Sequence, residues 1–96
     1  MSLAPHSRHM NLVAQAGCVI CKRFENLDSP AEVHHVAEGS GVRSDYMTVG
    51  LCAEHHRGAT GLHGMGPRAF LRFYRPPGES EYGLLAWVNE DIARMR

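Results

Sequence analysis

The chain has 96 residues, three cysteines, seven histidines and a formal net charge of +0. This length suits one domain with a thin hydrophobic core, and small domains often gain stability from a metal ion or from disulfides. The neutral balance gives no reason by itself to expect a nucleic-acid partner, and the lack of an apolar run of about 18 residues excludes a membrane-spanning helix.

The start of the chain lacks the charged and apolar regions of a signal peptide, so we expect a cytoplasmic protein. Thiols stay reduced in that compartment. A Cys-x-x-Cys pair is there more typical of metal binding or redox chemistry than of a structural disulfide. The three cysteines are therefore interpreted as candidate metal ligands.

The first half of the chain predicts one helix and two strands. Apolar residues at i, i+3 and i+4, followed by a glycine, predict a helix over residues 5–17. Cys18 and Cys21 come next on an expected tight turn, where two thiolates could hold one zinc ion. A polar segment leads to a strand expected over residues 32–36, which contains two adjacent histidines, and alternating apolar residues predict a second strand over residues 45–51. The glycine-containing loop between the strands is too short for a phosphate-binding motif.

The second half predicts three helical segments. Residues 52–57 have the pattern of a first helical turn, and the glycines that follow limit this helix to one or two turns. Pro67 can open a longer helix that ends before Pro76. The apolar stripe of this helix contains Phe70, Phe73 and Tyr74. A last helix is expected over residues 80–96. Its apolar face contains Leu85, Val88, Ile92 and Met95.

Three cysteines and one histidine fall into two closely spaced pairs, Cys18/Cys21 and Cys52/His55. A structural zinc site takes four Cys or His ligands in a tetrahedron, and short-spaced pairs supply them with little loop strain. The alternatives are buried free thiols beside an unrelated histidine, or a thioredoxin-like redox pair whose βαβ context is missing here. The spacing favours zinc.

Four further histidines suggest a second centre: His34, His35, His56 and His63. His56 lies about 100° around the predicted helix from its neighbour His55, so these two side chains face different sites. Phosphodiester hydrolysis needs a base that activates water and positive charge near the developing phosphorane. An imidazole and a divalent metal ion can supply these.

Taken together, the motifs resemble a known nuclease family. Cys-x-x-Cys, Val-His-His-Val and Leu-Cys-x-x-His-His are similar to the HNH endonucleases, also called ββα-metal or His-Me finger nucleases. In many of these the helix reads Leu-Cys-x-x-Cys-His, so His55 stands where the second cysteine is and His56 matches the last histidine. The wider pattern is similar to the phage recombination-enhancement (Ref-like) nucleases. It is carried by Gly39–Arg43, Ser44–Asp45, Val49–Cys52, His55–Arg57, His63 and the Phe-bearing helix.

We therefore expect an α+β fold with a zinc-stabilised ββα-metal core: a two-stranded antiparallel hairpin and a short helix, flanked by N- and C-terminal helices. One HNH-type nuclease domain would span residues 1–96, with its motif core over residues 18–75. The resemblance also implies a role for each histidine. His35 would be the general base, His34 and His56 would hold a catalytic Mg²⁺ or other divalent ion, and His63 would be a third ligand or a phosphate contact.

The chain departs from the family at the middle asparagine, which orients the base or shapes the loop. No asparagine occurs between His35 and Cys52, and Asp45 is the nearest polar candidate. An aspartate could hold the second ring nitrogen of the base and fix its tautomer, or it could only cap the start of the second strand. The departure keeps a second function open, namely a non-catalytic zinc-binding module for nucleic acid or protein that derives from a decayed nuclease.

Arginines in a segment without acidic residues are candidates for contact with nucleic acid: Arg57, Arg68, Arg72 and Arg75. The last three recur at helical spacing and could position a DNA backbone, although a solvated helix face would give the same pattern. Trp87 could stack on a base, but we interpret it as a core residue. The expected partner is DNA, with single-stranded and branched DNA included, and the resemblance adds a recombinase filament.

Overall fold

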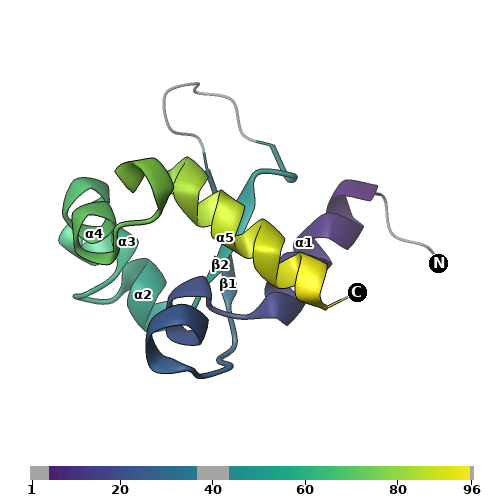
Figure 1. Ribbon diagram of the computed structural model, residues 1–96, viewed down its shortest axis with the longest axis horizontal. Coiled ribbons are helices and arrows are strands. Elements are labelled where there is room, and N and C mark those ends of the chain that lie inside the picture. The colour runs from purple at the N-terminus through teal and green to yellow at the C-terminus, as the bar shows by residue number, and fades with distance from the viewer. Residues whose placement is uncertain (1–4, 37–43, 96) are drawn as a thin grey trace.

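The two strands form a small antiparallel hairpin, and helices lie around it (Figure 1). The computed structural model describes residues 5–36 and 44–95. In chain order the elements are α1 (Pro5–Ala16), η1 (Cys21–Glu25), β1 (Glu32–His35), β2 (Thr48–Leu51), α2 (Ala53–Arg57), α3 (Leu62–Met65), α4 (Pro67–Tyr74), η2 (Pro77–Glu79) and α5 (Glu81–Arg94). This arrangement confirms the predicted α+β class, with β1, β2 and α2 in the expected order.

The register of the hairpin places His34 opposite Val49 and His35 opposite Thr48. All four residues of β2 are buried, whereas those of β1 are half-buried. The first strand is one residue shorter than predicted. The second begins three residues later than predicted because residues 45–47 form a turn, closed by a hydrogen bond from the backbone N–H of Met47 to the carbonyl oxygen of Ser44. The predicted glycine-containing loop lies outside the described residues.

Helices from both ends of the sequence pack on β2 and on each other. Figure 1 shows α5 crossing the hairpin, with its C-terminal end beside α1. Where α1 ends, a Cβ added to Gly50 would lie 2.7 Å from the carbonyl oxygen of Gly17, so only glycine at position 50 allows this approach. Gly17 itself has a φ of +82°, which lets the chain turn from α1 directly into the first cysteine pair.

Two predicted apolar faces differ from the observed ones. In α4 the side chains of Phe70 and Leu71 are buried, but Phe73 is 70% exposed. At about 100° per residue, burial of Leu71 shifts the inner face away from Phe73. In α5 the buried apolar side chains are those of Leu84, Val88 and Ile92, of which Leu84 was not predicted, while the predicted Met95 is 43% exposed just after the last residue of the helix. Periodicity alone thus located both helices but misassigned the edges of their buried faces.

Trp87 is partly buried against the core, and the guanidinium carbon of Arg23 lies 4.9 Å from its ring centroid. This side chain is therefore engaged within the fold, in agreement with its interpretation as a core residue. Among the described residues, none of the helices is both long and apolar enough to cross a membrane.

Candidate metal centres

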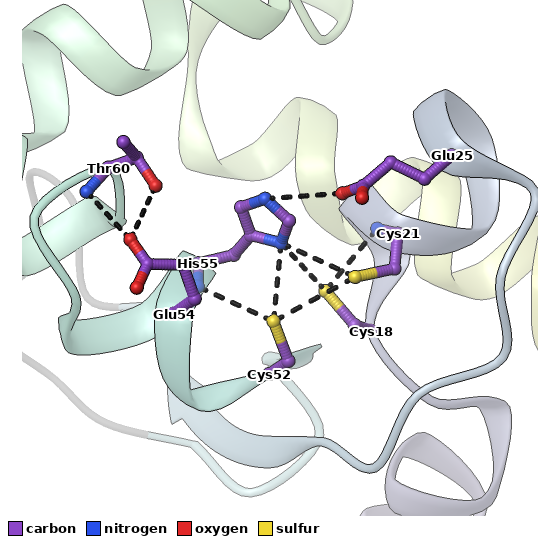
Figure 2. Close-up of polar contacts among 7 residues, drawn as sticks. All are labelled: Cys18, Cys21, Glu25, Cys52, Glu54, His55 and Thr60. Atoms are coloured by element: carbon purple, nitrogen blue, oxygen red, sulfur yellow. Dashed lines mark hydrogen bonds and ion pairs between the residues drawn. The ribbon is translucent and has the colours of Figure 1, made fainter.

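Cys18, Cys21, Cys52 and His55 converge on one point and form the cysteine centre (Figure 2). The Nδ1 atom of His55 lies 3.3 Å from the sulfur of Cys52 and 3.5 Å from the sulfurs of Cys18 and Cys21. The sulfurs of Cys21 and Cys52 are 3.8 Å apart. With Zn–S bonds of about 2.3 Å and Zn–N bonds of about 2.0 Å, tetrahedral ligand atoms are separated by roughly 3.5–3.8 Å. The four side chains therefore fit one zinc ion.

In both cysteine-bearing turns, a backbone N–H three residues further along donates to the cysteine sulfur. The backbone N–H of Cys21 donates to the sulfur of Cys18 over 3.4 Å, and the backbone N–H of His55 donates to the sulfur of Cys52 over 3.5 Å. The first pair was predicted on a tight turn, and the π-helical segment η1 begins at Cys21, the last residue of that turn. Backbone donors aimed at sulfur stabilise the thiolate form that binds metal.

The surroundings of the cysteine centre also suit a metal ion. Burial raises the pKa of Cys18, and it raises the pKa of Cys21 to about 12, so a metal ion must displace thiol protons when it binds. Figure 2 shows the outer nitrogen of His55, Nε2, facing Glu25, with a separation of 3.6 Å from the carboxylate oxygen. A carboxylate at that position orients the ring so that Nδ1 faces the sulfurs.

A second group, the histidine centre, consists of His34, His56 and His63, which come from β1, α2 and α3. Their ring centroids are 4.8–5.3 Å apart, and one candidate ligand atom from each lies within 4.8 Å of the others. The helical offset between His55 and His56 directs one of them to each centre, as predicted. Partial desolvation, followed by the charges of the two neighbouring histidines, lowers the pKa of His63 and so favours its neutral, metal-binding form.

Two carboxylates hold the outer nitrogens of this centre. Nε2 of His34 donates to Glu81 over 2.7 Å, and Nδ1 of His56 donates to Glu32 over 2.8 Å. Arg57 adds an ion pair to Glu32, with its Nη2 2.9 Å from the carboxylate. Hydrogen bonds from Arg57 and then from His56 lower the pKa of Glu32 to about 2. Arg57 is still 66% exposed, and its predicted contact with nucleic acid stays a prediction.

The donor set of the histidine centre indicates which ions it can hold. Imidazole nitrogens suit zinc, nickel, copper and iron, whereas magnesium prefers carboxylate, carbonyl and water oxygens. Nitrogen ligands on one ion lie roughly 3.0–3.4 Å apart if M–N bonds are about 2.1 Å. The candidate ligand atoms of the three rings lie within 4.8 Å of one another, close enough to face a single ion. Three imidazole ligands therefore fit a divalent transition metal better than they fit magnesium.

The adjacent residue of β1 faces a different partner. Nε2 of His35 lies 2.8 Å from Oδ1 of Asp45, in the turn before β2. This is the contact that a supporting role for Asp45 requires. The carbonyl oxygen of Asp45 also accepts a hydrogen bond from the Thr48 hydroxyl over 3.1 Å, so the residue helps to begin the strand as well. The alternation of side chains along a strand explains why His34 and His35 have separate partners.

The three arginines predicted to share one face of a helix do not all lie in that helix. Arg68 and Arg72 line a surface hollow of about 360 Å³, together with Glu79. Arg75 follows the last residue of α4, with a left-handed φ of +52°, and thus lies outside the helix that was expected to include it. The basic face of α4 therefore consists of Arg68 and Arg72.

These observations define a small α+β fold with two candidate metal centres. Residues 2–92 match the family described as recombination enhancement, RecA-dependent nuclease, and the chain belongs to this family. The match confirms the predicted resemblance to Ref-like nucleases and indicates a nuclease that acts in recombination. No curated protein and no solved structure matches the chain.

Proposed function

We propose that this protein is a metal-dependent endonuclease of the HNH class that hydrolyses phosphodiester bonds in DNA. The observation that carries the proposal is the convergence of His34, His56 and His63 from three elements. The residue that follows His34 in β1, His35, contacts Asp45. Membership of a nuclease family supports the reaction class. The arrangement offers one group to take a proton and three groups to hold an ion.

In the proposed mechanism His35 is the general base. If Asp45 accepts the hydrogen on Nε2, the other ring nitrogen, Nδ1, is the unprotonated one in the neutral ring and would take a proton from the attacking water. The histidine centre would hold a divalent ion, which supplies positive charge that stabilises the phosphorane and the leaving oxygen. Attack of the activated water breaks one P–O bond of the DNA backbone. The cysteine centre keeps the elements that carry these groups in place.

We further propose that a recombinase filament of the RecA type presents the DNA. The name of the family states RecA dependence. The described surface has a short basic face, Arg68 and Arg72, which suits contact with backbone phosphates rather than recognition of a sequence. Selectivity would then come from the DNA structure and from the filament, with single-stranded and branched DNA as candidate substrates.

The central test removes weakly bound metal, keeps the tightly bound zinc, and follows nicking of supercoiled plasmid and cleavage of single-stranded DNA. Mg²⁺, Mn²⁺ or Ni²⁺ is added, with and without a RecA filament. We expect cleavage that depends on added metal and disappears in His56→Ala, while the zinc content stays unchanged. If folded, zinc-loaded protein cleaves none of these substrates with any metal, the non-catalytic binding module is the better interpretation.

The basic face of α4 gives a separate prediction. Changing both Arg68 and Arg72 to glutamine should weaken DNA binding about equally for all sequences. Each phosphate contact contributes about 0.9 to the slope of log affinity against log salt, so this slope should fall by about 2. Titrations at several salt concentrations measure it. Arg94→Gln, at the exposed end of α5, is the matched control. Equal slopes for the two proteins would mean that the α4 arginines are only a solvated face.

A further inference from the structure

We propose that Glu81, the first residue of α5, is a positioning residue of the histidine centre. It would hold one ring nitrogen of His34 so that the other nitrogen faces the metal ion. The inference rests on the proposed metal-dependent function and deepens it, because it adds a group from outside the β1–β2–α2 unit to the site.

The first argument is the contact itself. Oε1 of Glu81 lies 2.7 Å from Nε2 of His34, and the two side chains are only 13% and 11% exposed. A carboxylate shielded to this degree loses hydration and needs a hydrogen-bond donor in exchange. A bond of this length to a charged acceptor belongs to the stronger class of hydrogen bonds. The position of Glu81 in the first turn of α5 also favours a negative charge there.

The second argument concerns which nitrogen is left for a metal ion. A ring nitrogen that donates its hydrogen to a carboxylate cannot bind a metal at the same time, so Nδ1 of His34 remains. Among the described residues, the three histidines have ligand atoms close enough together to share one ion. Glu81 does not belong to this group. Glu81 therefore acts on the site through His34 rather than as a ligand.

The third argument is that the centre is held from two sides. Glu32 holds His56 from within the hairpin, whereas Glu81 holds His34 from the C-terminal helix. Figure 1 shows that the N-terminal end of α5 lies on the side of the molecule where α3 and α4 are found. Packing of α5 on β2 and α1 fixes the position of this helix. The helix thereby supplies a rigid support for the ring of His34.

The test measures metal binding without DNA. Zinc-loaded protein is titrated with Ni²⁺ at constant pH by calorimetry, and Co²⁺ is added to read the coordination from its visible absorption spectrum. Wild type is compared with Glu81→Ala and Glu81→Gln. Glu90→Gln, on the same helix but paired with Arg23, is the matched control. His34→Ala identifies the binding event that belongs to the histidine centre, and circular dichroism verifies folding.

We expect Glu81→Ala to weaken Ni²⁺ binding by about tenfold or more, as is typical when an outer partner of a metal ligand is lost. Glu81→Gln, whose side-chain oxygen can still accept the hydrogen bond, should recover part of this affinity. The Co²⁺ spectrum should keep its band positions, and Glu90→Gln should bind as wild type does. Wild-type affinity in Glu81→Ala would overturn the inference, and so would a Co²⁺ spectrum that shows the loss of a ligand.

This readout separates the inference from the proposed function. Protein that cleaves no DNA but loses Ni²⁺ affinity in Glu81→Ala would support the positioning role and contradict the nuclease proposal. If the protein cleaves DNA but Glu81→Ala leaves its Ni²⁺ affinity unchanged, the nuclease proposal is supported and the positioning role is contradicted.

Discussion

Replacing His35 by alanine should reduce DNA cleavage by about 10²–10⁴-fold, the usual contribution of a general base. The fold and the zinc content should not change, because His35 lies in neither the cysteine centre nor the histidine centre. The rate is best measured in single turnovers at saturating metal and DNA, so that slow product release does not hide the chemical step. Added free imidazole should restore part of the activity if the missing group is a base.

Asp45 provides the matched test of how His35 is held. Asp45→Asn keeps an oxygen that can accept the hydrogen of Nε2 but removes the charge, whereas Asp45→Ala removes both. We expect the rate to fall in the order wild type, Asp45→Asn, Asp45→Ala. If Asp45 only helped to begin β2, these variants would lower stability and leave the rate per folded molecule unchanged. Full activity in His35→Ala would assign the base to another residue.

The parts of the site that could be predicted are those set by local spacing. Cys-x-x-Cys and Cys-x-x-His each bring two ligand atoms together within one turn, whatever the rest of the chain does. The helical offset of His55 and His56 is equally local, and it correctly separated the two centres. Glu32 could have been found in the same way, because it precedes His34 by two residues in a strand and thus shares its face.

Features that depend on tertiary packing could not be predicted. Glu81 and His34 are 47 residues apart, and nothing in the local pattern of either residue indicates the other. The ion pair between Arg57 and Glu32 similarly joins α2 to β1. The exposure of Phe73 depends on which side of α4 meets the rest of the fold, and an amphipathic pattern with three aromatic residues leaves that choice open. Periodicity located the longer helices and the hairpin but not η1 or α3, and the packing then selected the partners of each element.

Removing the metal from the cysteine centre should unfold the protein. Its four ligands join the end of α1, the start of η1 and the first turn of α2, which follows the hairpin directly. A two-stranded sheet has little stability of its own. Structural zinc sites in small domains contribute about 10–16 kcal/mol of binding free energy, which is comparable to the whole stability of a domain, about 5–15 kcal/mol. Loss of the ion should therefore remove most of the free energy of unfolding.

The measurement combines a strong chelator, metal analysis to verify zinc loss, and circular dichroism before and after zinc is returned. Cys52→Ser should behave like the chelated protein, because a hydroxyl is a much weaker zinc ligand than a thiolate. His56→Ala is the matched control: it removes a ligand of the histidine centre and should stay folded with its zinc bound. An unchanged spectrum after verified zinc loss would show that the core around Phe70 and Leu84 holds the fold without the ion. Unfolding of both variants would instead mean that the two centres stabilise the fold together, because α2 carries a ligand of each.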